Sequence, residues 1–223
     1  MISISAEAKN AYPELAAGIM ITSSINNRYL NSKMETESRA LENTIRKTHE
    51  GLDRKDLTSM EVMSGYCSYY KKFTKTYHVL LQLESIAFIN KQIPQVSPIV
   101  QSMFMGELKN HFLTSVHDFS YVEKPLELGC SKGTEEFTSF NGEKKILKKD
   151  DLYIGDTKSI ISAILYGMDE TTKVTETTSS ALFTVYVPFK TPREKIEEHL
   201  RDTASYLKLN DESISIDCIT LIH

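Results

Sequence analysis

One histidine lies where a ligand-binding group could be placed. His117 is followed by Asp118 and Phe119 in the segment 114–122, which we expect to be a turn between a helical part and a strand-rich part. Imidazole exchanges protons near neutral pH, and pockets can form where two structural layers meet. The sequence therefore offers His117 as a pocket residue; the alternative is a structural histidine whose ring nitrogens bond nearby backbone.

The other histidines and the cysteines predict neither a metal site nor a nucleophile. His111 and His117 are six residues apart, which is not a spacing that places two ligands on one helix face. Four histidines stand in polar contexts and are expected to face solvent: His49, His78, His199 and His223. Cys67, Cys130 and Cys218 form no CxxC pair, so we expect no zinc site and no disulfide framework.

Four lysines follow the turn signal Asn141-Gly142 as two pairs: Lys144, Lys145, Lys148 and Lys149. A hairpin edge that presents them could contact an RNA phosphate backbone. Asp150 and Asp151 follow directly and partly cancel the positive potential of these lysines. The alternative interpretation is a solvated lysine cluster that protects a strand edge from pairing with another strand. The chain has 26 Lys+Arg against 30 Asp+Glu, a formal charge of −4, which argues against broad phosphate binding and leads us to expect no DNA partner.

Composition places the chain among globular proteins. Its 223 residues are 40% hydrophobic and 25% charged, which suffices for a core without disulfides. The sequence has no run of about 18 apolar residues and no secretory signal pattern, so we expect a cytoplasmic protein with no membrane span. It contains no P-loop, dinucleotide-binding, zinc-protease, serine-hydrolase or EF-hand motif, and we expect no cofactor.

Helical signals dominate the first half of the chain. Ser32 and Glu35 fit a capping box that opens a helix. Helical spacing recurs over 58–73 and 79–90. Ser97-Pro98 predicts an N-cap followed by a first-turn proline.

Strand signals dominate the second half, over 126–130, 136–140, 151–155, 160–166 and 181–188. Asn141-Gly142 predicts a hairpin with a type I′ turn. Thr191-Pro192 predicts the capped start of a last helix, and an alternating strand over 213–222 ends the chain. The buried stripe of that last helix is expected to be Ile196, Leu200, Ala204 and Leu207. Helices packed on a mainly antiparallel sheet give an α+β fold, and we expect one domain over residues 1–223.

Five segments occur in an order that resembles a known family: 93–100, 115–119, 126–129, 137–142 and 148–154. The family is the tRNA-editing domain of the phenylalanyl-tRNA synthetase β-subunit, or B-three/B-four domain, with its freestanding relatives. Its pattern has a proline-containing entry to a helix, a His-Ala-Phe-Asp-like turn, a Leu-Asp-Gly-like hairpin and an Asp-Leu-Val-Ile-like strand.

This resemblance implies an α+β domain whose pocket admits the acceptor end of a mischarged tRNA. The implied chemistry is metal-independent ester hydrolysis by a positioned water. His117 matches the family's histidine and would bond the acceptor-end ribose or the water. The other implied pocket positions are Phe104, Leu165, Gly167 and Thr184. Phe104 replaces part of a Thr-Asn pair and Thr184 replaces a glutamate, so two polar groups of the family are missing.

Three functions therefore remain open. The first is recognition of an aminoacyl-tRNA acceptor end with hydrolysis in trans, and the second is a catalytically inactive module that binds RNA or a small ligand. The third is a structural partner that uses a tyrosine-rich surface at 66–70, although the same tyrosines and Cys67 are expected to pack within the core, because nothing near them in sequence would activate a thiol.

Overall fold

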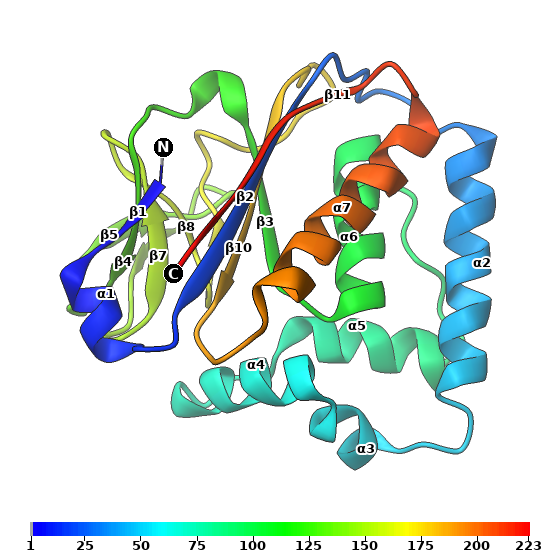
Figure 1. Cartoon of the computed structure of the whole chain (residues 1–223), viewed down its shortest axis with the longest axis horizontal. Coiled ribbons are helices and arrows are strands. Elements are labelled where there is room, and N and C mark those ends of the chain that lie inside the picture. Colours follow the sequence, from blue (N-terminus) through cyan, green and yellow to red (C-terminus); the bar gives the residue numbers. More distant parts are fainter. Residues whose placement is uncertain (1) are drawn as a thin grey trace.

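Two larger β-sheets, a two-stranded hairpin and a set of helices build the fold in the computed structural model, which describes residues 2–223 (Figure 1). The first sheet is antiparallel and four-stranded, in the order β11 (Ser215–Ile222), β2 (Ala16–Ser23), β10 (Ala181–Val187) and β3 (Thr114–Asp118). The second has the order β1 (Ile2–Ile4), β4 (Leu126–Cys130), β7 (Leu152–Gly155), β8 (Ile160–Ala163) and β9 (Gly167–Met168). In this second sheet β1 pairs with β4 in parallel and the other pairs are antiparallel, so the predicted α+β class with a mainly antiparallel sheet is confirmed.

The helices are α1 (Ala6–Ala11), α2 (Ser32–Thr48), α3 (Arg54–Ser59), α4 (Glu61–Lys72), α5 (His78–Ala87), α6 (Pro98–Asn110) and α7 (Arg193–Asn210). Figure 1 shows α6 and α7 on one side of the four-stranded sheet and the second sheet on its other side. At Gly18 of β2, an added Cβ would stand 2.9 Å from a side-chain carbon of Ile196 in α7. The glycine therefore permits close packing of helix on sheet.

Three predicted helix boundaries are wrong. The N-cap of α2 is Asn31 rather than Ser32, because the Asn31 side chain accepts the Met34 N–H at 2.9 Å and also donates to carbonyls at the end of α7. The predicted helix over 58–73 is broken at Met60, whose backbone is extended between α3 and α4. In α7, Pro192 occupies the N-cap position, so Thr191 does not cap the helix.

The hairpin over Asn141-Gly142 forms, although its turn is not type I′. It joins β5 (Glu136–Thr138) to β6 (Lys144–Ile146) through a five-residue loop, since Thr138 pairs with Lys144. Only Gly142 of the turn pair has a positive φ, +81°. The Asn141 side chain instead accepts the hydroxyl of Ser139 at 2.6 Å and so stabilises the longer loop.

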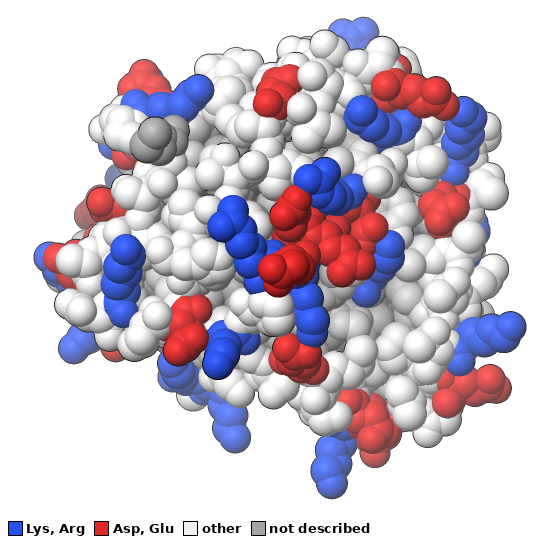
Figure 2. All heavy atoms as spheres, in the orientation of Figure 1, with Lys and Arg blue, Asp and Glu red and all other residues white. Residues whose placement is uncertain are grey.

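The main hydrophobic core joins helices to both sheets. The predicted stripe of α7 is buried at Ile196, Leu200, Ala204 and Leu207, which confirms its helical period. On the face shown in Figure 2, acidic side chains gather in a central patch with lysine and arginine side chains around it, and the basic side chains form no continuous surface. Within residues 2–223 no helix combines the length and apolar character needed to cross a membrane.

Candidate functional site

His117 lies in a strand, not in the expected turn. It is part of β3 and pairs with Leu182 of β10, so the chain turns only after Asp118, in a short 3₁₀ helix over Phe119–Tyr121. The ladder to β10 overrides the local turn signal because it satisfies the backbone of the whole segment 114–118. Thr114 bonds to α7, and alternation along the strand therefore turns His117 to the opposite face of the sheet.

Both ring nitrogens of His117 are engaged by hydroxyl side chains. Nε2 lies 3.0 Å from Ser115 Oγ, and Nδ1 lies 2.7 Å from Thr172 Oγ1. The Thr172 hydroxyl donates to Asp169 Oδ1, so its oxygen accepts from Nδ1–H and leaves Nε2 to accept from Ser115. Burial lowers the pKa of His117 to about 3, which keeps the ring neutral near pH 7.

Ser115, His117, Thr172 and Asp169 are connected by hydrogen bonds, and we call these four residues the relay. Their donors and acceptors are ordered so that the Ser115 hydroxyl could pass a proton to the imidazole. The position that could react is closed, however, since Ser115 is 5% exposed and His117 is 0% exposed. Two contacts also hold the loop after β9 against β3: the Thr172 hydroxyl bonds to His117, and the Thr172 backbone carbonyl accepts the Asp118 N–H at 2.7 Å. The hydrogen bonds among these four residues therefore stabilise the fold and do not present a reactive group to solvent.

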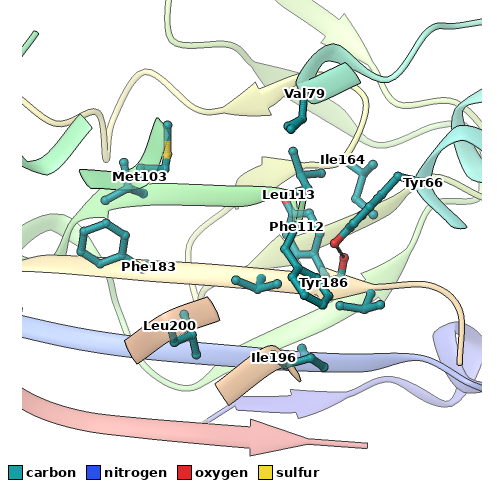
Figure 3. Packing of buried hydrophobic residues seen from close by; sticks show 14 of the residues in the cluster. Tyr66, Val79, Met103, Phe112, Leu113, Ile164, Phe183, Tyr186, Ile196 and Leu200 are labelled. Atoms are coloured by element: carbon teal, nitrogen blue, oxygen red, sulfur yellow. Dashed lines mark hydrogen bonds between the residues drawn. The ribbon is translucent and has the colours of Figure 1, made fainter. Parts of the chain in front are cut away.

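Thr184 lies beside this chain. It is the register partner of Ser115 on β10 and is 0% exposed, and its hydroxyl has no hydrogen-bond partner among residues 2–223. The fold therefore brings His117 and Thr184 to one face around Ser115. Figure 3 shows the neighbouring packing on β10, where Tyr66 of α4 donates its hydroxyl to the Tyr186 carbonyl at 3.1 Å.

The other predicted pocket residues lie on α6 and in the segment from β8 to β9. Phe104 is on α6 and lines a groove with Ile86 and Pro94. Leu165 is buried in the turn between β8 and β9, and Gly167 follows it with a positive φ of +78° and open space at its Cα. Phe104 thus lines a separate groove, whereas β9, which begins at Gly167, packs against β3, the strand that carries His117.

A polar hollow lies next to the relay. It has a volume of about 160 Å³ and is lined in part by Lys144, Thr138, Ser159, Thr171 and Asp169. The carboxylate of Asp169 is thus shared between the hollow and the Thr172 hydroxyl. Through Asp169, this hollow contacts the hydrogen-bonded residues around His117.

The four predicted RNA-binding lysines point to different neighbours. Lys144 lines the polar hollow, whereas Lys145 pairs with Glu143 at 2.5 Å. Lys148 donates to the Phe73 carbonyl at 3.2 Å, and Lys149 packs against Gly133.

Two histidines expected on the surface are buried. His49 Nδ1 lies 2.7 Å from the Ile45 carbonyl at the end of α2. His199 Nε2 lies 2.7 Å from Thr114 Oγ1, beneath the sheet. His199 follows Ile196 by three residues and therefore lies on the buried stripe of α7. This spacing predicts a buried side chain from the sequence.

Among the buried carboxyls that the sequence did not lead us to expect, Glu107 and Asp151 have raised pKa values. Burial raises the pKa of Glu107 on α6 to about 8, against a hydrogen bond from Thr114 N–H that opposes the rise. Burial also raises the pKa of Asp151 to about 7, and Tyr69 donates to it at 2.7 Å. Glu107 follows Met103 by four residues and lies on the same buried side of α6. Its burial could therefore have been predicted from this spacing.

The tyrosine-rich helix α4 belongs to the core. Tyr66, Tyr69 and Tyr70 are at most 3% exposed, so the expected core packing is confirmed and a tyrosine-based docking surface at 66–70 is wrong. Among residues 2–223, no three His, Cys, Asp or Glu side chains gather as metal ligands would.

Comparisons with known proteins support the fold. No protein-family model and no curated protein matches the chain. The fold is shared with a part of a tRNA synthetase subunit. That structure is an N-terminal fragment of the phenylalanyl-tRNA synthetase β-subunit from Pyrococcus horikoshii, with a TM-score of 0.50 and 12% sequence identity. The similarity covers 100% of this chain and 54% of the fragment, so the chain spans about half its length.

Proposed function

We propose that this protein recognises the acceptor end of a tRNA with a B-three/B-four-like domain, in the cytoplasm. The observation that carries the proposal is the fold similarity, which extends over 100% of the chain. The polar hollow supports the proposal, because Lys144 at its wall can pair with a phosphate and the carboxylates of Glu136 and Asp169 can accept hydrogen bonds from ribose or base groups of an RNA end.

Recognition without hydrolysis is the function that the geometry supports best. His117 and Thr184 are 0% exposed, and both nitrogens of His117 already have hydroxyl partners. A general base must come within hydrogen-bond reach of the proton that it removes. An ester at the hollow could not reach His117 while Thr172 and Asp169 stand between them.

Hydrolysis of a mischarged aminoacyl-tRNA in trans is the second candidate. It is favoured by the polarity of the relay, in which Nε2 of His117 accepts from the Ser115 hydroxyl. This activity would require the loop that carries Thr172 to move away from β3.

Binding and deacylation assays separate the two candidates. Wild-type protein should bind tRNA with an intact CCA end more tightly than the same tRNA without it, and Lys144→Ala should weaken this binding and reduce the slope of log affinity against log salt by about 1. The control is Lys47→Ala, at an exposed position on α2. Equal binding of both tRNAs would refute the proposal.

The same preparations are tested on a panel of correctly and incorrectly charged tRNAs. Recognition alone predicts no clearance of any species. Clearance of one mischarged species by wild type, lost in a His117→Ala variant that still unfolds cooperatively, would establish the second candidate instead.

A further inference from the structure

The four-stranded sheet has a free edge at β11. This strand of eight residues pairs only with β2, so on alternate residues its backbone N–H and C=O point away from the sheet. Within residues 2–223 no backbone hydrogen bond joins these outer groups to another element, and β1, which contacts β11, bonds to β4. Figure 1 shows β11 on the near side of its sheet. The backbone of β11 can therefore accept a further strand.

β11 carries little of the protection that unpaired edges usually have. Such edges are short, bent by a bulge, or marked by lysine or proline. The bulge of β11 is near its start, at Asp217, and the run from Cys218 to Ile222 is regular and contains no charged residue and no proline. Thr220 is exposed in the middle of this run. The apolar side chains of the strand are only partly buried: Ile216, Cys218, Ile219, Leu221 and Ile222. A strand that paired with β11 would cover them further.

Helix α7 runs beside the same edge. It contacts β2 and β11, whereas its neighbour α6 contacts β3 at the opposite side of the sheet. His199 and Thr203 mark the side of α7 that faces α6, because both lie against Gly106. At about 100° per residue, the side away from α6 points past β11. Four charged residues, none of them buried, form this side, and we call them the α7 edge stripe: Glu194, Glu197, Arg201 and Lys208.

The α7 edge stripe changes sign along the helix. Glu194 and Glu197 lie in its N-terminal half, and Arg201 and Lys208 lie in its C-terminal half. Arg201 and Glu197 pair within the helix at 2.6 Å with side chains 66% and 40% exposed, so the pair is weak and can exchange partners.

Pairing of β11 with itself would bring two α7 edge stripes together. Strands in a sheet are about 4.8 Å apart, so two copies of α7 on either side of a β11–β11 pair would lie roughly 10 Å apart. A two-fold axis reverses the direction of the second helix. The acidic half of one stripe would therefore face the basic half of the other.

We infer that β11 and the α7 edge stripe bind a second copy of this chain about a two-fold axis. The two β11 strands pair antiparallel and join the two four-stranded sheets, and the two stripes lie side by side. The change of sign along α7 selects a second copy rather than an unrelated strand, because the stripe is complementary to itself. This surface shares no residue with the polar hollow, so the inference goes beyond the proposed function.

Sedimentation velocity of the full chain over a range of concentrations tests the inference. Wild type should form a species of twice the mass of the chain, in a fraction that rises with concentration. Thr220→Asp places like charges close together near the axis and should weaken dimerisation about tenfold or more. Thr36→Asp makes the same change at an exposed position on α2 and should leave dimerisation unchanged.

Charge reversal on α7 tests how the two copies are oriented. Arg201→Glu sets acidic groups of the two stripes against each other and should weaken dimerisation about fivefold or more. Addition of Glu197→Arg to this variant restores opposite charges across the axis and should recover most of the affinity. Thermal melting confirms that each variant is folded.

Hydrogen exchange of wild type locates the interface. Amides of residues 218–222 that point away from β2 should gain protection as the concentration rises through the dissociation constant, and amides of α5 should not. A wild type that stays monomeric at every concentration would overturn the inference and leave the edge to a strand of another protein. A dimer without added protection at β11, or Thr220→Asp or Arg201→Glu dimerising as tightly as wild type, would overturn it as well.

Discussion

The buried carboxyl of Glu107 predicts an unusual dependence of stability on pH. Glu107 is 1% exposed on α6; Oε1 accepts the Thr114 N–H at 2.8 Å, and Oε2 has no hydrogen-bond partner in the described part of the chain. Burial raises its pKa from the ordinary 4.5 to about 8, so the folded protein holds a proton that the unfolded chain releases. The stabilisation by this proton is complete below about pH 4.5 and is lost as the pH rises through about 8.

The magnitude follows from the two pKa values. Each pH unit between these two values lowers the free energy of unfolding by about 1.4 kcal/mol. The interval from 4.5 to about 8 therefore sets an upper limit of about 5 kcal/mol on the loss. Relaxation around the charged form lowers this limit. In Glu107→Gln the amide keeps the acceptor for Thr114 N–H and cannot ionise, so we expect the variant to gain at least about 2 kcal/mol over wild type between pH 5 and pH 8.5.

The assay is urea denaturation of both proteins at several pH values over that range. The quantity compared is the difference in free energy of unfolding, variant minus wild type, because other titrating groups cancel in it. Glu14→Gln, the same change at an exposed position, is the control. A difference for Glu107→Gln that stays flat with pH would refute the reasoning that a protonated carboxyl is buried here.

Two further substitutions test the packing of α4 and of the relay. Gly65→Ala should destabilise the protein by about 1–3 kcal/mol, because its Cβ would stand 2.5 Å from the Phe189 ring, and unchanged stability in urea denaturation would contradict this contact. Thr172→Val should cost about 2–4 kcal/mol by removing the hydroxyl partner of both His117 and Asp169, and should expose the loop after β9 to proteolysis; protection equal to wild type would contradict it.

The sequence by itself determined most of the local structure. The four-residue repeat from Ile196 to Leu200 placed the buried side of α7, and Ser97-Pro98 marked the start of α6. Alternation and Asn141-Gly142 located the hairpin and the strands β4, β5, β7, β8, β10 and β11, whereas β3 was expected to be a turn. These signals are readable because side-chain period and backbone preference act between residues close in the chain.

Only the tertiary structure decided the chemistry of the polar groups. His117 meets Thr172 across 55 residues, and Tyr69 meets Asp151 across 82. Burial at those contacts, not residue type, holds His117 neutral and raises the pKa of Asp151. Desolvation depends on which elements cover a group, and that is set by how β3, β10 and the helices pack together, which no local pattern specifies.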